Sequence, residues 1–253
     1  MTMLYKKDSY INTDILYLVS HEIIEYDISS AGFNLSKRCK LLSSDKLKYL
    51  ESLGKKERHI QVGLYQKNDK DFKKALNEKF IEIRKEFLEA NNVQDDEILS
   101  IKKDAIIMLR RCNVTEFDNV IFKDKHQYTS YYYINKNEFY VSNDNLDVKG
   151  ISDNKLKLHK DYMLDFLFKF FKSMEQSSSK KKLIKDLTDF TYYYKNKELM
   201  IGYYRELNEN SLFKLKKNFL NDFIGVDNIS NIDDIDISYN YMNYIVPIIN
   251  ILL

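Results

Sequence analysis

Two aspartates stand where the expected secondary structure would bring them together. Asp27 follows an apolar run at residues 23–26 that is rich in residues favouring β-strands. Asp104 lies between two further β-prone runs, residues 98–101 and 105–109, which places it at the tip of a hairpin. If the strand and the hairpin are neighbours in one sheet, the two carboxylates converge. Convergent carboxylates hold Mg²⁺, because a hard cation prefers oxygen ligands and the like charges need a cation between them.

This pair of acids would suit phosphoryl transfer. Two magnesium ions about 3.5–4 Å apart stabilise both the attacking and the leaving oxygen of that reaction. Asp27 and Asp104 are therefore candidate catalytic and metal-binding residues, with Mg²⁺ or Mn²⁺ as the expected cofactor. The chain also holds 38 Asp and Glu in all, so two acids at strand ends can arise by chance. In that case the protein is an ordinary α/β interaction domain.

Composition argues against several other kinds of site. The 253 residues include 2 Cys, Cys39 and Cys112, too few for a disulfide scaffold or a thiolate zinc site. The 4 His show no i, i+4 pairing, and the chain has neither a P-loop nor a G-x-G-x-x-G motif. No apolar run approaches the ~18 residues of a membrane span, and the first residues do not resemble a signal peptide. We expect a cytoplasmic protein in a reducing compartment, with no membrane partner.

Charge is distributed unevenly along the chain. Residues 36–85 carry 15 Lys and Arg against 7 Asp and Glu, a local balance of +8, although the whole chain carries a net charge of +2. Residues 218–253 contain five Asp and no Lys or Arg. The basic sector would suit a phosphate-bearing partner. The alternative is that its lysines are ordinary solvent-exposed charges on long helices.

The surrounding pattern indicates a mixed first half and a helical second half. Residues 72–90 place Leu76, Phe80, Ile83 and Phe87 on one apolar stripe, which predicts a helix ending at Asn91 and Asn92. Ser44 is the expected N-cap of a shorter helix. The expected elements are helices at 43–52, 72–90, 162–174 and 183–194, a flexible basic connector at 176–182, and strands at 23–26, 98–101, 105–109, 119–122, 128–134 and 138–141.

Four short motifs, in order, resemble the palm of family B DNA polymerases over residues 23–151. The segment E-Y-D-I-S-S-A at 25–31 is similar to the family's D-F/Y-x-S-L-Y-P-S strand end. The long helix followed by I-L-S-I-K-K-D-A-I-I at 98–107 is similar to the helix and hairpin that carry D-T-D-S. F-K-D-K-H-Q-Y at 122–128 and L-D-V-K-G-I at 146–151 resemble the later K-K-R-Y and K-G-I/V segments.

The resemblance implies roles for particular residues. It implies that Asp27 and Asp104 bind the metal and that the backbone of the next segment lies along an incoming nucleoside triphosphate. That segment consists of Ile28, Ser29, Ser30, Ala31 and Gly32. It also implies a primer–template partner whose backbone lies near Lys125, Tyr128 and Lys149. In the basic sector, the candidates to bind triphosphate oxygens are Lys55, Lys56 and Arg58. Arg58 would bind them with bidentate geometry. The alternative is that all three are solvated charges on a helix.

The chain also departs from the family pattern. Lys102 takes the place of the first hairpin acid and Lys103 that of the threonine. Gly32 falls where the family has the tyrosine that excludes a ribose 2′-hydroxyl, so discrimination against ribonucleotides should be weak unless Phe33 replaces it. His126 stands in place of the second lysine of K-K-R-Y. The K-x₃-N-S-x-Y-G motif of the fingers is not recognisable, and the chain has no room for an exonuclease domain.

Together these observations predict an α+β protein. An antiparallel-sheet, palm-like domain at residues 1–151 would carry a short fingers-like insertion at 35–71, and residues 152–253 would form an α-rich, thumb-like region. The expected function is template-directed nucleotidyl transfer with two Mg²⁺ ions, in a phage or mobile element. The alternative is a palm-derived protein that no longer turns over substrate and binds nucleic acid or a protein. A protein partner could supply the missing fingers elements.

Overall fold

The computed structural model describes residues 3–134, 136–150, 164–176, 179–199 and 248. The protein is α+β, and every strand pair with a defined register is antiparallel. The chain divides into two compact units. The first comprises Met1–Asp14 and Glu22–Gln127, and the second comprises Ile15–His21 and Tyr128–Leu253. The expected boundary after residue 151 falls within residues 151–163, which lie outside the described residues. The acidic segment 218–253 also lies outside the described residues, apart from Ile248.

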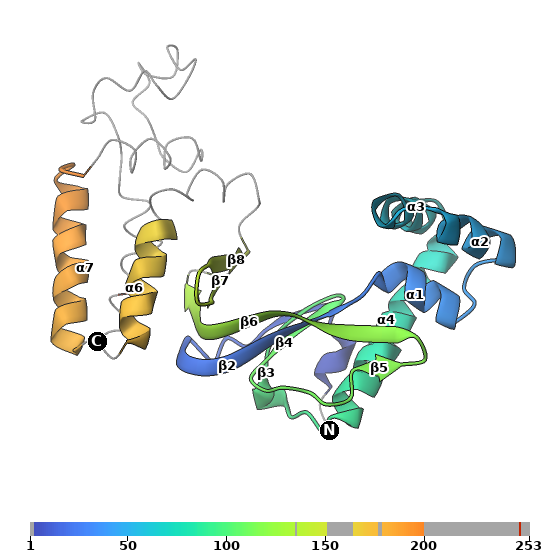
Figure 1. Ribbon diagram of the computed structural model, residues 1–253, viewed down its shortest axis with the longest axis horizontal. Helices are drawn as coiled ribbons and strands as arrows, with labels where there is room; N and C mark the ends of the chain where they lie inside the picture. The colour runs from blue at the N-terminus through green and yellow to red at the C-terminus, as the bar shows by residue number, and fades with distance from the viewer. Residues whose placement is uncertain (1–2, 135, 151–163, 177–178, 200–247, 249–253) are drawn as a thin grey trace, which may run out of the picture. The chain divides into compact units, whose positions relative to one another are not determined.

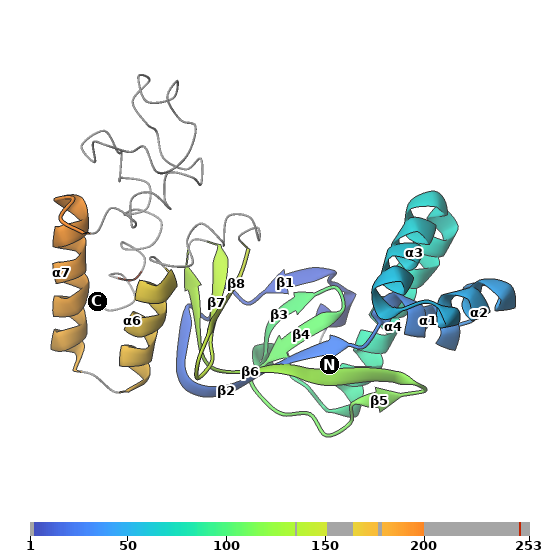
Figure 2. The same ribbon diagram turned by 45° about the horizontal axis from the view of Figure 1, so that its top comes forward.

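The first unit is a sheet with helices on one face. Its strands run in the order β1-β3-β4-β2-β6, with β5 paired to β6. Figures 1 and 2 show α4 along this sheet, and α1, α2 and α3 gathered where β2 ends. The elements are η1 (Leu4–Lys6), β1 (Ser9–Ile11), β2 (Tyr17–Ile28), α1 (Ala31–Arg38), α2 (Ser44–Ser52), α3 (Lys55–Asn68), α4 (Lys70–Ala90), η2 (Asp95–Glu97), β3 (Ile98–Lys102), β4 (Ala105–Met108), β5 (Glu116–Phe117) and β6 (Val120–Ile134).

Helix α4 forms because its sequence supplies both caps and a continuous apolar stripe. The Asp69 side chain accepts a hydrogen bond from the Phe72 backbone N–H at 2.9 Å, which satisfies one of the free donors of the first turn. The chain leaves the helix through Asn92, at φ 51°. The four predicted stripe residues are all buried. Phe87 stacks on Phe122 of β6 with 4.1 Å between ring centroids, and this contact fixes the helix against the sheet.

The second unit pairs a small sheet with two helices. Here β6 pairs with β7 (Asn137–Val141), and β7 pairs with β8 (Leu146–Lys149). Helices α6 (Asp165–Glu175) and α7 (Lys180–Lys195) pack through aromatic rings. Tyr132 of β6 stacks on Phe171 at 3.9 Å, and Phe166 stacks on Phe190 at 3.6 Å. Stacked aromatic rings therefore join β6 to α6 and α6 to α7.

Several sequence-based boundaries were wrong. The expected strands at 119–122 and 128–134 are one long strand, β6, which continues through the exposed polar residues 123–127. Ser43, not Ser44, caps α2, because its side chain accepts the Lys46 N–H. Helix α7 already begins at Lys180, so the triple lysine belongs to a helix. Helix α3 was not predicted, because its apolar residues form no continuous stripe and only Val62 is buried.

Candidate active site

The β2 strand and the β3–β4 hairpin are neighbours, as the two-carboxylate hypothesis requires. In the β2–β4 register Asp27 lies opposite Ala105, the residue after Asp104. The Ile28 N–H donates to the Asp104 carbonyl at 3.1 Å. Lys102 pairs with Ala105, so Lys103 and Asp104 form a two-residue turn in which Lys103 has a φ of 47°. The fold thus brings the two acids to one place although 77 positions separate them in the sequence, 104 minus 27.

The two carboxylates act on each other electrostatically. Burial is the main cause that raises the pKa of Asp104; a hydrogen bond to backbone opposes it, and the negative charge of Asp27 raises the pKa further. Lys103 and Lys125 partly counter this effect. A carboxyl whose charge is disfavoured by burial and by a like charge gains from a bound cation. The arrangement is therefore suited to hold a positive ion between Asp27 and Asp104.

Lys125 of β6 lies close to two acids of β2, Asp27 and Glu25. Lys125 of β6 lies 3.1 Å from Asp27 and 3.6 Å from Glu25, measured from its ammonium nitrogen to the carboxylate oxygens. The Glu25 side chain is only 2% exposed. Burial by itself would lower the pKa of Lys125. The hydrogen bonds and the electrostatic attraction that Lys125 makes with Asp27 and Glu25 outweigh burial, so its pKa is raised. Sequence reasoning missed Glu25, although the period of two along a strand puts it on the same face as Asp27.

Arg84 of α4 forms a hydrogen bond with the hairpin turn. Its side chain is fully buried, at 0% exposure. Its guanidinium donates to the Lys103 carbonyl at 2.8 Å, to the Tyr5 carbonyl at 3.0 Å and to the Asp8 carboxylate at 3.3 Å. The contact with Lys103 fixes the peptide that precedes Asp104. Sequence reasoning missed Arg84 as well, and the available signal was a charged residue inside the apolar stripe of α4.

The expected triphosphate segment, residues 28–32, turns from β2 into α1. The N–H groups of Ile28 and Ser29 already donate, to Asp104 and to the Ile121 carbonyl at 3.0 Å. Ser30 has a φ of 47° and opens the helix without a side-chain cap. The N–H groups of Ala31 and Gly32 belong to the first turn, where no i−4 carbonyl within the helix accepts them. Of this segment, Ala31 and Gly32 are the residues positioned to donate to an anion.

Gly32 has a packing role that excludes a larger residue. A Cβ atom at this position would lie 2.8 Å from Cγ1 of Val62 on α3. The close approach of α1 and α3 therefore depends on the missing side chain. A side chain as large as tyrosine at this position would not fit against α3 unless Val62 moved.

The three expected triphosphate cations of α3 differ in their surroundings. Arg58 donates to the carbonyls of Leu50 and Leu53, each at 2.9 Å, and its guanidinium lies 4.6 Å from the centroid of the Phe33 ring. Its donors are thus largely used in holding α2 against α3. Lys55 and Lys56 are exposed in the first turn of α3. Within the described ranges, no ion pair joins either lysine to Asp27 or Asp104.

The expected nucleic-acid residues belong to different units. Lys125 is in the first unit, beside Asp27, whereas Tyr128 and Lys149 are in the second. The Tyr128 hydroxyl donates to the Asp147 carboxylate at 2.7 Å, and the Lys149 ammonium lies 3.6 Å from the same carboxylate. The structure thus brings Tyr128 and Lys149 together through Asp147.

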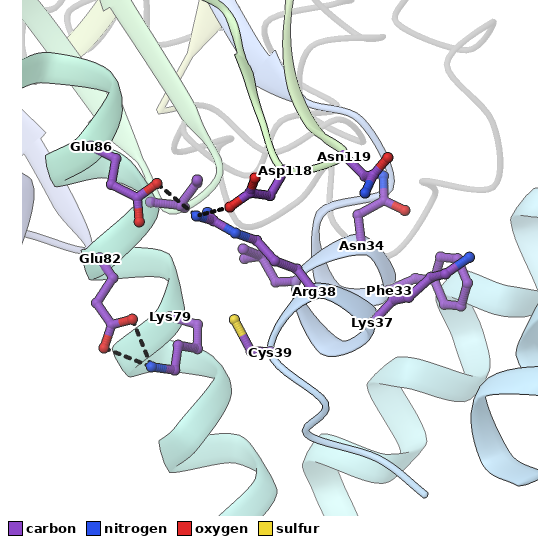
Figure 3. A pocket seen from close by; sticks show the side chains of 12 residues that line it. Phe33, Asn34, Lys37, Arg38, Cys39, Lys79, Glu82, Glu86, Asp118 and Asn119 are labelled. Atoms are coloured by element: carbon purple, nitrogen blue, oxygen red, sulfur yellow. Dashed lines mark hydrogen bonds and ion pairs between the residues drawn. The ribbon is translucent and has the colours of Figure 1, made fainter. Parts of the chain in front are cut away.

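A cavity of about 620 Å³ lies between α1, α4 and the β5–β6 turn. In Figure 3 the Arg38 guanidinium points between Glu86 and Asp118, at 2.8 and 3.2 Å. Lys79 is 2.6 Å from Glu82 on the same wall. These charges neutralise one another, and burial raises the pKa of the Cys39 thiol, which disfavours the reactive thiolate. The cavity includes neither Asp27 nor Asp104.

The donor set of Asp27 and Asp104 suits magnesium held jointly with a substrate. In the described part of the chain, no three His, Cys, Asp or Glu side chains are grouped to enclose a metal ion. Mg²⁺ is commonly bound through one or two carboxylates, with water and substrate phosphates completing its octahedral shell. Two carboxylates on neighbouring elements that influence each other electrostatically offer hard oxygen donors of that kind.

The fold and the site define an α+β protein with paired carboxylates on an antiparallel sheet. Over residues 1–253 the chain matches the family described as Bacteriophage PBS1 gene 130 protein, and it belongs to that family. No solved structure matches the chain. The family assignment agrees with the expected phage origin. Among the described residues no helix has both the length and the apolar character needed to cross a membrane.

Proposed function

We propose that the protein is a minimal palm-type nucleotidyltransferase that extends a nucleic-acid primer. The observation that carries the proposal is the register of β2 and β4, which sets Asp27 beside Asp104. The chain order supports it, because a strand ending in an acid, a group of helices and an acid-bearing hairpin follow one another as in the palms that the sequence resembles. The family B polymerase assignment is part of this proposal.

In the proposed reaction the primer 3′-hydroxyl attacks the α-phosphorus of a nucleoside triphosphate. A phosphodiester bond forms, the bond from the α-phosphorus to the oxygen it shares with the β-phosphate breaks, pyrophosphate leaves, and the proton of the 3′-hydroxyl passes to water. Asp27 and Asp104 would hold Mg²⁺ or Mn²⁺, which would supply positive charge to stabilise the attacking and leaving oxygens. The protein contributes mainly position and electrostatics, as is usual for phosphoryl transfer.

The remaining residues take supporting roles in this proposal. Arg84 fixes the turn that carries Asp104, and the N–H groups of Ala31 and Gly32 donate to triphosphate oxygens. Lys55 and Lys56 add positive charge at the first turn of α3. The exposed cations of the basic sector attract the template strand. With Gly32 at the position of the family tyrosine, we expect ribonucleotides to be accepted beside deoxyribonucleotides.

Primer extension tests the proposal. The assay uses the full chain with a labelled primer–template, deoxyribonucleotides or ribonucleotides, and Mg²⁺ or Mn²⁺. We expect extension by the wild type and a loss of at least about 10³-fold in Asp27→Asn and Asp104→Asn, because each removes a metal ligand. Asp96→Asn is the matched control, because Asp96 is exposed in η2. If Asp104→Asn extends primers as well as Asp96→Asn does, the proposal fails.

The second candidate is a palm-derived binding protein without turnover. The observation that favours it is the ion pair of Lys125 with Asp27, together with a lysine, Lys102, at the place of the first hairpin acid. Such a protein would bind nucleic acid or a protein partner, and Mg²⁺ would not raise its melting temperature. Fluorescence anisotropy with labelled single-stranded DNA, with and without EDTA, distinguishes the two candidates. Metal-independent binding without any extension would favour the second.

A further inference from the structure

The position of Lys125 has a consequence for metal binding at the proposed site. The ammonium group lies 3.1 Å from Oδ2 of Asp27, which is ordinary ion-pair distance. A magnesium ion ligates a carboxylate oxygen at about 2.0–2.1 Å and demands near-octahedral geometry. A cation bound to the same carboxylate would therefore meet a positive charge only a few ångströms away. Repulsion at that distance is strong at a partly buried site.

Glu25 allows the lysine to leave Asp27 without leaving the cluster. The Lys125 ammonium is 3.6 Å from the Glu25 carboxylate, and the Lys125 side chain is 47% exposed. The exposed end of this flexible chain can turn away from Asp27 while Glu25 keeps it nearby. Glu25 is on the same strand as Asp27, two residues earlier, so both acids face the lysine.

More than one cation acts on these carboxylates. Lys103 and Lys125 both counter the burial that raises the pKa of Asp104, and Asp104 acts on Arg84. Among these cations Lys125 is the one whose ammonium lies at ion-pair distance, 3.1 Å, from Asp27. A divalent ion that binds the Asp27 carboxylate would therefore displace Lys125 in particular.

We infer that Lys125 is an internal competitor for the divalent cation, so that metal binding at Asp27 and release of Lys125 are a single exchange. This inference rests on the proposed function, because it concerns the same site. Lys125 then regulates metal loading without being a metal ligand, because the ion that binds Asp27 must displace it.

The test is the Mn²⁺ affinity of the full chain, measured by isothermal titration calorimetry without nucleotide. Lys125→Met removes the competing charge and should tighten Mn²⁺ binding about tenfold, because the bound ion then meets one nearby positive charge fewer. Lys123→Met is the matched control, two residues earlier on the same strand and also exposed. It should leave the affinity unchanged. Far-UV circular dichroism confirms that each variant is folded.

Each outcome bears on the inference. Tighter binding in Lys125→Met alone, lost again in the double variant with Asp27→Asn, supports the exchange. Equal affinity in Lys125→Met and wild type, with binding lost in Asp27→Asn, overturns the exchange and leaves the proposed function standing. If neither the wild type nor Lys125→Met binds Mn²⁺, the metal site fails and the inference fails with it. A gain in Lys123→Met equal to that in Lys125→Met would also overturn it, because the effect would then be general charge and not competition.

Discussion

Replacing Arg84 by methionine tests whether this buried side chain holds the Asp104 turn. Methionine is apolar and shorter than arginine, so it replaces the aliphatic part of the side chain and removes the hydrogen-bond donors of the guanidinium. The change removes the donors to the Lys103 and Tyr5 carbonyls at 2.8 and 3.0 Å and to Asp8 at 3.3 Å. A buried acceptor left without its donor costs about 1–3 kcal/mol. Asp8 is largely exposed and regains water, so its loss adds little.

Two buried carbonyls at that cost each predict a loss of about 2–6 kcal/mol in the free energy of unfolding. The assay is urea denaturation followed by far-UV circular dichroism. Arg111→Met is the control, because Arg111 also contacts two acids, Glu22 and Asp124, but is half exposed. Surface ion pairs contribute about 0–1 kcal/mol, so the control should change little. An Arg84→Met variant no less stable than Arg111→Met would refute the assigned role.

Two further predictions concern Gly32 and Asp104. Gly32→Ala should lower the free energy of unfolding by about 1–3 kcal/mol, because its Cβ would lie 2.8 Å from Cγ1 of Val62. Val62→Ala in the same chain should restore part of that loss. A double-mutant cycle measured by urea denaturation tests this coupling. Additive effects would contradict the contact. The folded-state pKa of Asp104 is raised above 3.8, so the native state holds its proton more tightly than the unfolded chain. Stability from this group is fully present below pH 3.8 and is lost as the pH rises through the folded pKa. Asp104→Asn should therefore be more stable than wild type at pH 7 and should lose that advantage in acid. Melting temperatures measured across a range of pH test this prediction. A gain in stability that does not depend on pH would contradict the burial argument.

The parts of the site that could be predicted from the sequence are those set by local pattern. The apolar stripe of α4 and the asparagines after it carry enough information to define a helix and its end. Two β-prone runs separated by a short polar turn define the β3–β4 hairpin. The meeting of Asp27 and Asp104 was a conditional prediction, since strand order is a long-range property. The register of β2 against β4 confirms that the strand and hairpin are neighbours.

The parts that could not be predicted depend on contacts between distant residues. Arg84 shares the buried face of α4 with the apolar stripe, but the pattern of the helix does not show that its partners are the Tyr5 and Lys103 carbonyls. Lys125 lies in a polar run that was assigned to no strand, yet the long β6 strand carries it to Asp27. Arg58 was expected to grip phosphate, whereas the fold directs its donors to the last carbonyls of α2. Long-range pairing decides the partners of such charged side chains, and composition does not.

The central claim is that Asp27 and Asp104 together support metal-dependent nucleotide addition. The most direct measurement is incorporation of a single labelled nucleotide onto a primer terminus by the full chain, with Mg²⁺ or Mn²⁺ and with EDTA. We expect incorporation by the wild type and Asp96→Asn that EDTA abolishes, and none by Asp27→Asn or Asp104→Asn. Incorporation that survives in Asp104→Asn, or a wild type that adds no nucleotide with either metal, would contradict the claim.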